Sequence, residues 1–538
     1  MQGDPGPLSE ANDSRAGTLS ASATWDKTQE TSMLPSSAGF CRSLVCAVVF
    51  PLAACGGGSG DEAPPSTTAM ACTDFKAGQT VGDGVIVSAT AVAASAPLPE
   101  YCDVRGTLAP KTTFTIRMPT QWNNRTVYVG GGGFNGNLAA PNVQYLSAGF
   151  AQIASTGGND VPNTANFALD PLALNDYSYL SVHRTAHVGK EIVRSFYGRN
   201  ETRNYFTGCS KGGQEALIEA QRWPDDFDGI VAMAPAIELQ SLFLGFTRNN
   251  KLIFTPGGNL TPAKLDTLNK AILAACDAQD GATDGLLSQP KLCTFNPAAL
   301  RCSGADSDAC LTDPQVTTAS SLYGTWSLNG KQYLPGFYVG SEATWNGTQT
   351  GAVTAATPRY SNLFADQYVR YFVTQDPTAS AFTFDPLPWL SRITQLSLLS
   401  DSDNPNLAAF RARGGKLILY HGLADSAISP KDTEAYYQAV VAAAGGQAEA
   451  NKFVKAYFNP GVGHCTGGPG ADTVDLFTPM VNWVESGTDP TSSTITATKV
   501  AQGGATVLSR PLCPYPQYPR YKGTGALTDA GNFVCTQP

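Results

Sequence analysis

The sequence is poor in charged residues and has no excess of basic ones. Only 15% of the 538 residues are charged, against about 25% in an average globular protein. The formal net charge is −9 and both signs are scattered, so no basic face is available to a nucleic acid. We therefore expect no nucleic-acid partner. The 54 glycines and 36 prolines indicate a loop-rich globular protein.

The cysteines are not arranged for binding metal. No pair has the CxxC spacing, and no cluster of Cys and His has the spacing of a structural zinc site. Three of the thirteen, Cys41, Cys46 and Cys55, lie in the N-terminal segment. The other ten are spread along the chain: Cys72, Cys102, Cys209, Cys276, Cys293, Cys302, Cys310, Cys465, Cys513 and Cys535. An even, dispersed set predicts disulfides and an oxidising compartment.

The apolar stretch near the N-terminus, residues 44–50, is too short to span a bilayer. It follows Arg42 and leads to Leu-Ala-Ala-Cys55, which is typical of a signal peptide, so translation from Met33 is expected rather than from Met1. The same four residues resemble a bacterial lipobox, whose cysteine is lipidated. We expect a secreted or periplasmic protein, anchored through Cys55 as a bacterial outer-membrane lipoprotein. The alternative is an ordinary signal peptide that happens to contain Cys55.

Strand-like runs alternate with glycine-rich turns and helical patterns. Four such runs span residues 126–129, 204–207, 229–233 and 416–420. This alternation predicts a mostly parallel sheet with helices on both faces. The pattern fades between about 286 and 410, which we interpret as an inserted lid. The expected organisation is an N-terminal extension and signal peptide (1–55), a tether (56–71), a first core part (72–285), the lid (286–410) and a second core part (411–538).

Ser210 is the candidate nucleophile. Gly208-Cys209-Ser210-Lys211-Gly212 fits G-x-S-x-G, the sharp turn that raises a serine hydroxyl above a sheet edge. The motif alone is weak, but a strand-like run precedes it and strong helix formers follow at 213–220.

His464 is the candidate base by elimination among four histidines. His183 and His187 share a helical face without the Glu of a zinc-protease motif, so capping or packing is expected of them. His421 sits at a strand end four residues before Asp425, and we expect it to shape that loop. His464 follows Asp425, which gives the chain order Ser, Asp, His of α/β-hydrolases.

Asp425 is the candidate acid, since it follows the strand that ends at Tyr420. Such an acid fixes the tautomer of the histidine and stabilises its imidazolium. Asp401, Asp403 and Asp432 are rivals, but none directly follows a strand. A solvated loop residue is the alternative reading of Asp425.

A candidate oxyanion hole follows the run at 126–129. Gly130 to Gly133 would let backbone N–H groups approach a tetrahedral oxyanion. We expect the donors to be the N–H groups of Gly133 and Lys211. A flexible turn is the alternative and accounts less well for four glycines.

At Gly-Cys-Ser-Lys-Gly-Gly and Gly-His-Cys the sequence resembles the tannase and feruloyl esterase family, across nearly all of 72–538. Residues 510–516 and 520–523 are especially similar to its mono(2-hydroxyethyl) terephthalate hydrolase branch. The resemblance implies an α/β-hydrolase fold with a large lid domain inserted before the catalytic Asp. It also implies five bridges: Cys72–Cys102, Cys209–Cys465, Cys276–Cys293, Cys302–Cys310 and Cys513–Cys535.

Residues 277–286 form an acidic, glycine-bearing loop whose carboxylates suit a hard cation. The spacing is not that of an EF-hand. The resemblance implies structural calcium on the side chains of Asp277, Asp280 and Asp284 and the carbonyls of Ala282 and Leu286. A solvated acidic turn is the alternative.

The resemblance also implies substrate contacts. Arg359 would hold a free carboxylate, and Trp345 would lie against an aromatic ring. The sequence departs from the terephthalate branch at four substrate positions: Gly132, Leu363, Phe364 and Ile428. A small terephthalate half-ester and a natural feruloyl or galloyl ester are therefore equally expected.

The sequence thus predicts a secreted, monomeric serine ester hydrolase that acts on aromatic acid esters through an acyl-enzyme and needs no organic cofactor. A calcium-stabilised, catalytically silent surface binding protein on the same scaffold is one alternative. A peptidase is another.

Overall fold

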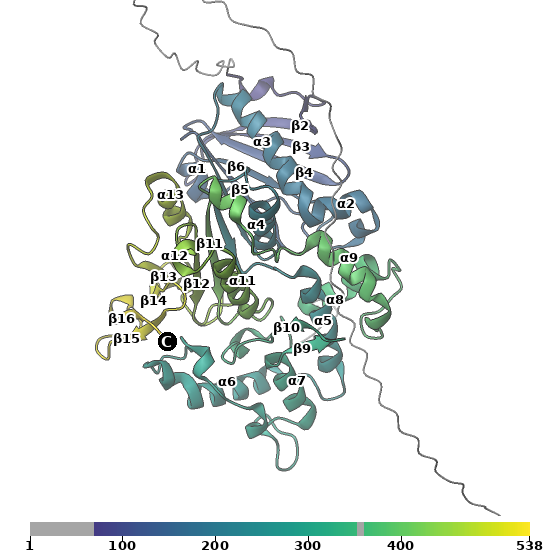
Figure 1. The fold of residues 1–538 in the computed structure, drawn as a ribbon, viewed down its shortest axis with the longest axis vertical. Coiled ribbons are helices and arrows are strands. Elements are labelled where there is room, and N and C mark those ends of the chain that lie inside the picture. Colours follow the sequence, from purple (N-terminus) through teal and green to yellow (C-terminus); the bar gives the residue numbers. More distant parts are fainter. Residues whose placement is uncertain (1–68, 352–359) are drawn as a thin grey trace, which may run out of the picture. The chain divides into compact units, whose positions relative to one another are not determined.

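The structure is a computed structural model and describes residues 69–351 and 360–538 (Figure 1). The predicted extension, signal peptide and lipobox, nearly all of the tether and Arg359 lie outside the described residues. Within the described ranges, no helix has the length and apolar character needed to cross a membrane.

A ten-stranded sheet forms the centre of the described chain, in the order β1-β2-β3-β4-β6-β5-β7-β8-β11-β12. Its strands are β1 (Thr80–Val81), β2 (Gly84–Val92), β3 (Tyr101–Leu108), β4 (Thr112–Pro119), β5 (Arg125–Val129), β6 (Ala151–Ser155), β7 (Arg203–Cys209), β8 (Gly229–Met233), β11 (Lys416–Gly422) and β12 (Val454–Asn459). The first four pair antiparallel, as do β4 and β6, and the remaining pairs are parallel. The predicted α/β class and all four predicted strands are confirmed.

The register brings the carboxyl ends of three strands together. Cys209 at the end of β7 lies opposite Met233 of β8, and Met233 lies opposite Tyr420 of β11. Loops that leave these strands therefore begin at one edge of the sheet, which is where ligands bind in parallel α/β sheets.

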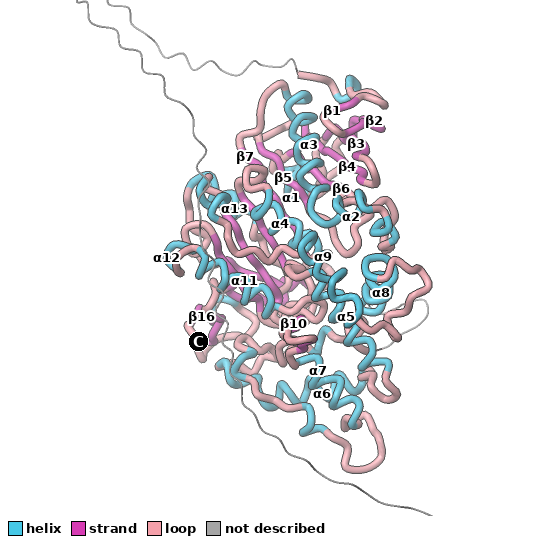
Figure 2. The backbone as a smooth tube through the Cα atoms, turned by 45° about the vertical axis from the view of Figure 1, so that its right-hand side comes forward, coloured by secondary structure: helices cyan, strands magenta, loops and turns pink. Residues whose placement is uncertain are grey.

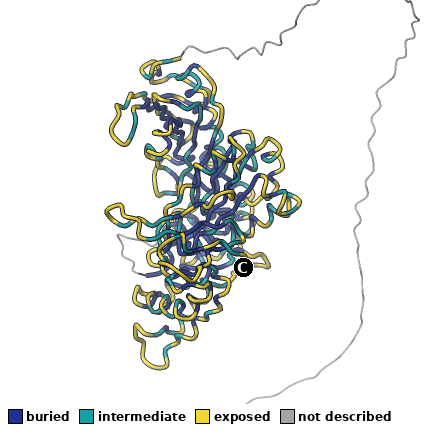
Figure 3. The backbone as a smooth tube through the Cα atoms, turned by 90° about the vertical axis from the view of Figure 1, so that its left-hand side faces the viewer, coloured by how far each residue is buried: buried dark blue, intermediate teal, exposed yellow. Residues whose placement is uncertain are grey.

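Helices cover both faces of the sheet (Figure 2). Successive side chains of a strand point to opposite faces, and in the central strands both sets are buried. Strand residues such as Phe206 and Leu419 share an apolar core with α3, α4 and α11. Their neighbours Tyr205 and Ile418 face α1 and α13. These helices are α1 (Val143–Ser147), α3 (Ser181–Tyr197), α4 (Lys211–Arg222), α11 (Pro430–Ala443) and α13 (Phe477–Ser486). Figure 3 shows the buried stretches of the described chain in its interior and the exposed stretches at its periphery.

A long segment, residues 234–415, separates the adjacent strands β8 and β11, and none of its described strands joins the sheet. It contains α5 (Leu239–Phe254), α6 (Pro262–Cys276), α7 (Asp313–Tyr323), β9 (Trp326–Leu328), β10 (Lys331–Leu334), α8 (Tyr360–Gln367), α9 (Leu390–Ser400) and α10 (Ala408–Ala412). This segment contains the predicted lid, residues 286–410, and also α5 and α6, which precede it. Much of it packs in two apolar clusters distinct from those of the sheet.

The remaining short elements are α2 (Pro171–Asn175) and α12 (Gln447–Ala450), together with two C-terminal hairpins. The hairpins pair β13 (Ile495–Val500) with β14 (Thr506–Leu512) and β15 (Tyr518–Tyr521) with β16 (Phe533–Thr536). All five bridges implied by the family resemblance are present.

Candidate active site

Ser210 occupies the turn between β7 and α4, where the chain reverses from strand to helix. Its backbone has φ 65° and ψ −121°, a conformation that costs a non-glycine residue about 1–3 kcal/mol. The neighbours leave no room for side chains: a Cβ on Gly208 would lie 2.5 Å from the carbonyl oxygen of Gly212. A Cβ on Gly213 would lie 2.5 Å from that of Met233. The Ser210 N–H donates to the same Met233 carbonyl at 3.0 Å, which fixes the turn against β8.

His464 and Asp425 form a close pair from the loops after β12 and β11. His464 Nδ1 lies 2.7 Å from Asp425 Oδ2. Burial would raise the pKa of Asp425, but His464 and His421 outweigh it and hold that pKa well below its usual range. Burial would likewise lower the pKa of His464, but the charge and hydrogen bond of Asp425 outweigh it and raise that pKa above 6.5. The pair therefore favours an ionised acid beside a strengthened base.

Asp425 is held from three further directions. Its Oδ1 accepts the N–H groups of Ala427 at 2.8 Å and Ile428 at 2.9 Å. Its Oδ2 also lies 3.1 Å from Nε2 of the fully buried His421, whose Nδ1 lies 2.8 Å from Thr433 Oγ1. Sequence reasoning expected His421 to shape this loop but missed its direct contact with the acid. The four-residue spacing between the two was the available signal.

A cavity of about 500 Å³ brings Ser210 and His464 to one surface. The Cys209–Cys465 disulfide closes one side, because each cysteine neighbours one of these two residues and also lines the cavity. The other lining residues are Val129, Gly130, Gly131, Gly132, Gly133, Asn142, Tyr145, Thr207, Gly208 and Met233.

Glu215 of α4 anchors the loop of four glycines after β5, residues 130–133, which we call the glycine loop. Glu215 Oε2 accepts the Gly131 N–H at 2.9 Å, while its Oε1 accepts from Asn135 at 2.9 Å and from Lys211 Nζ at 3.1 Å. A Cβ on Gly131 would lie 2.0 Å from Asn135 Oδ1, so only glycine fits this contact. Sequence reasoning had treated Glu215 only as a helix former. The side chain carried no signal of its buried role.

The predicted oxyanion donors lie in this loop and directly after Ser210. Within the described part of the chain, no hydrogen bond engages the N–H groups of Gly132, Gly133 or Lys211. The Lys211 side chain turns instead to Gln214 and Glu215. Gly133 has φ +58°, and Gly132 borders open space, with nothing within 4 Å of an added Cβ.

Trp345 lies in a core rather than on the wall of this cavity. Its side chain is fully buried, and its Nε1 donates to Ser341 Oγ at 3.0 Å. Its ring packs against that of Tyr323, with 5.0 Å between the ring centroids. The expectation of an aromatic wall is corrected accordingly. Physically, the ring closes the apolar cluster between α6 and α7.

Of the other predicted substrate positions, only Gly132 lines the cavity. Ile428 and Phe364 belong to one apolar cluster, and Phe364 lies 3.2 Å from where a Cβ on Gly133 would be. Leu363 is half-buried beside Phe364 on α8. Neither Leu363 nor Ile428 is among the cavity-lining residues, whereas Gly132 is.

The acidic loop folds back on its own carboxylates. Asp277 accepts the Gly285 N–H at 2.9 Å, and Asp280 accepts the Ser288 N–H at 2.5 Å. Asp284 pairs with the buried Arg510 at 2.5 Å. Burial, followed by the neighbouring carboxylates, raises the pKa of Asp280 to about 6.

Oxygen-only donors with raised carboxyl pKa values fit the chemistry of a hard cation. Among the described residues, however, the three aspartates are not a group whose ligand atoms converge within 4.8 Å. Backbone N–H groups and Arg510 occupy their oxygens instead.

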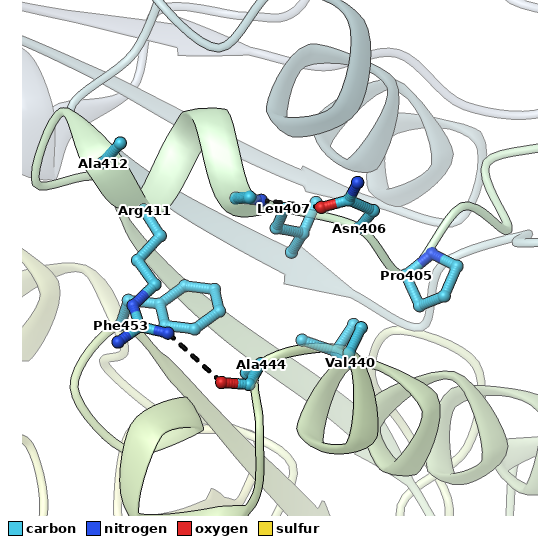
Figure 4. A pocket seen from close by; sticks show the side chains of 10 residues that line it. Pro405, Asn406, Leu407, Arg411, Ala412, Val440, Ala444 and Phe453 are labelled. Atoms are coloured by element: carbon cyan, nitrogen blue, oxygen red, sulfur yellow. Dashed lines mark hydrogen bonds between the residues drawn. The ribbon is translucent and has the colours of Figure 1, made fainter.

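A second cavity, of about 330 Å³, lies between α10 and α11 (Figure 4). Apolar side chains such as Leu407, Val440 and Phe453 line it, and Arg411 donates to the Ala444 carbonyl across it. None of its lining side chains is a nucleophile paired with a base, so it is not the candidate site.

Sequence comparison places the chain among ester hydrolases. The profile of the family described as "Tannase and feruloyl esterase" matches residues 96–536. The mono(2-hydroxyethyl) terephthalate hydrolase of Piscinibacter sakaiensis is 35% identical over 533 residues, covering 84% of this chain and 87% of that protein. A probable feruloyl esterase B-2 of Aspergillus terreus is 31% identical, covering 81% and 86%.

Comparison of structures agrees. Feruloyl esterase B from Aspergillus oryzae matches with a TM-score of 0.76 and 27% identity, over 86% of this chain and 99% of that chain. Tannin acyl hydrolase from Aspergillus niger matches with a TM-score of 0.67 and 21% identity, over 87% and 94%, which shows the shared fold.

Removing the Cys209–Cys465 bridge should cost more stability than removing a short-range bridge. It closes a separation of 256 residues, whereas Cys302–Cys310 closes only 8. Chain entropy then predicts a loss about 3 kcal/mol larger for Cys209→Ser/Cys465→Ser than for Cys302→Ser/Cys310→Ser. Urea unfolding of both double variants without reductant measures the difference. Equal losses would contradict the assigned role.

Proposed function

The chain belongs to the tannase and feruloyl esterase family and is a carboxylic ester hydrolase, and we propose that it cleaves aromatic acid esters with Ser210, His464 and Asp425. The observation that carries this proposal is the convergence of three features on one cavity. They are the strained Ser210 turn, the contact of 2.7 Å between His464 and Asp425, and the disulfide between Cys209 and Cys465, which adjoin Ser210 and His464 in the sequence.

The strand order supports an α/β-hydrolase arrangement. The nucleophile follows β7, the acid follows β11 and the base follows β12, so all three leave carboxyl ends of adjacent or nearby parallel strands. The inserted segment 234–415 contributes Phe364 beside the glycine loop, which supports its role as a lid.

Each group has a distinct task in the proposed reaction. His464 donates through Nδ1 to Asp425, so its Nε2 takes the proton of the Ser210 hydroxyl as Oγ attacks the ester carbonyl. The resulting oxyanion accepts the N–H groups of Gly133 and Lys211. His464 then gives the proton to the departing alkoxide, which leaves as the alcohol. Water, deprotonated by the same histidine, releases the acid from Ser210.

Asp425 keeps this cycle productive without taking a proton. Its lowered pKa means that it stays ionised, and so it stabilises the imidazolium that forms after each proton transfer. His421 and two backbone N–H groups hold the carboxylate in place. We propose that His421 is a positioning residue.

Ser210→Ala should abolish most hydrolysis while preserving the fold. Loss of the nucleophile from a triad lowers kcat by about 10⁴-fold or more. The measurement is kcat/KM for a p-nitrophenyl ester. Turnover by the wild type would also exclude the alternative of a catalytically silent binding protein. Near-normal turnover by the alanine variant would refute the assignment.

Arg359 is proposed to select half-esters that carry a free ring carboxylate. A guanidinium can hold a carboxylate through two parallel hydrogen bonds. The described cavity lining offers no cationic side chain other than His464. A substrate carboxylate would therefore need such a group from outside that lining. Without it, a neutral feruloyl or galloyl ester is the expected substrate.

The test compares kcat/KM for a terephthalate half-ester with that for its neutral diester. Arg359→Ala should cost about 1.5–3 kcal/mol on the half-ester and little on the diester. Arg359→Lys keeps the charge without the paired donors and should fall between. Equal effects on both substrates would remove Arg359 from the site.

Calcium at Asp277, Asp280 and Asp284, with the carbonyls of Ala282 and Leu286, is proposed to be structural. The loop follows α6 and lies next to the Cys276–Cys293 bridge rather than among the cavity-lining residues. A bound cation would supply the charge that lets these buried carboxylates ionise.

Chelation should therefore lower the melting temperature by several degrees, as expected when a ligand worth about 2–3 kcal/mol is removed. Asp280→Asn should melt lower and respond less to chelator. Metal analysis after dialysis would verify that the ion has been removed. Identical melting curves with chelator and with added calcium would count against the site.

The ten bonded cysteines support an oxidising compartment. On this basis we propose that the protein is exported. A signal peptide before residue 56, and lipidation of Cys55, remain part of the same proposal.

A further inference from the structure

A second constellation of titratable side chains lies away from the cavity of Ser210. Asp226 is in the loop that enters β8, whereas Ser210 is in the turn that leaves the parallel neighbour β7. Helix α4 connects the two and spans 12 residues, which corresponds to about 18 Å. The constellation therefore belongs to the opposite end of these strands.

Two histidines of α3 hold the two oxygens of Asp226. His183 Nδ1 lies 2.6 Å from Oδ2, and His187 Nε2 lies 3.1 Å from Oδ1. The histidines are four residues apart and so share one face of the helix. One ligand atom from each of the three residues can be chosen so that all lie within 4.8 Å of one another.

We propose that His183, His187 and Asp226 form a binding site for a divalent first-row transition metal, with Zn²⁺ as the best match. Two imidazole nitrogens and one carboxylate oxygen are a ligand set that zinc takes in proteins. Bond lengths of about 2.1 Å in a tetrahedron require ligand atoms about 3.4 Å apart. The two nitrogen–oxygen separations, 2.6 and 3.1 Å, would each need to open by less than about 1 Å to reach this value.

The surroundings hold one ligand rigid and leave another free to adjust. The His183 ring stacks on Trp223, with 4.0 Å between centroids and 14° between planes. Asp226 is buried, and Lys190 Nζ donates to its backbone carbonyl at 2.7 Å. The His187 side chain is 58% exposed, so it can move and leaves the fourth coordination position open to water.

Asp226 also has a buried cationic neighbour. Lys190 is the cation placed beside Asp226, at 3.8 Å from Oδ1. A divalent ion on Asp226 would therefore share this carboxylate with Lys190.

The bound ion would have a structural role rather than a catalytic one. It would join α3 to the loop entering β8, and neither element contributes a residue to the cavity of Ser210. Metal binding should therefore raise the melting temperature and leave ester hydrolysis unchanged. The other group of possible ligands among the described residues contains Cys302 and Cys310, which are bonded to each other and so cannot bind a metal in this way.

The experiment titrates the chelator-treated full chain with ZnCl₂ alone, by calorimetry and by thermal melting. His187→Gln removes one nitrogen ligand from an exposed position, so the variant should fold. It should weaken the zinc affinity by at least about tenfold and abolish the rise in melting temperature. Asp266→Asn, which removes an exposed carboxylate on α6, is the matched control and should bind zinc like the wild type.

Co²⁺ provides a second readout that does not depend on folding stability. Its visible absorption should show nitrogen ligands in the wild type and lose that signature in His187→Gln. Zinc bound by the N-terminal cysteines or by the acidic loop would be unaffected by this substitution. Equal zinc affinity and equal cobalt spectra for wild type and His187→Gln would overturn the proposal, as would the absence of any zinc-dependent rise in melting temperature.

Discussion

The left-handed backbone of Ser210 is the constraint on which the rest of the site depends. Such a conformation survives only where its surroundings over-determine it. Here β7, α4 and the end of β8 approach so closely that Gly208 and Gly213 cannot carry a Cβ without striking backbone. Gly212 packs equally closely against the glycine loop, because a Cβ added to it would lie 2.7 Å from the Gly131 carbonyl oxygen. One packing arrangement therefore positions both Ser210, the proposed nucleophile, and the proposed oxyanion donors.

His464, the proposed base, is positioned separately and is then joined to this arrangement. Asp425 receives four hydrogen-bonding contacts, of which His464 makes only one. The carboxylate is thus fixed by its own loop and by His421 before it orients the base. The Cys209–Cys465 bridge then joins the Ser210 turn to the His464 loop across a separation of 256 residues. Orientation and tethering come from different residues.

Local patterns were enough to predict the α/β class and the four strands, and they singled out Ser210 and His464, which line the cavity, and Asp425, which contacts His464. The strand runs, the glycine-flanked Ser210 and the order of Asp425 and His464 are all local signals. The cysteine pairing came from the family resemblance, because spacing alone does not select partners. The contacts of Glu215 and His421 depend on tertiary packing, which no periodicity reports. Similarly, the sequence around Trp345 gave no sign of whether its ring would face a core or a cavity.

The central claim is that His464, strengthened by Asp425, activates Ser210. Its most direct test is the rate of covalent labelling by a fluorophosphonate as a function of pH, followed by peptide mapping. The account predicts a single adduct on Ser210. Its rate should fall as the pH drops through the pKa of His464, which lies above 6.5, because the protonated imidazole cannot accept the serine proton. His464→Ala should label far more slowly. An adduct on another residue, or a rate indifferent to pH and to the loss of His464, would contradict it.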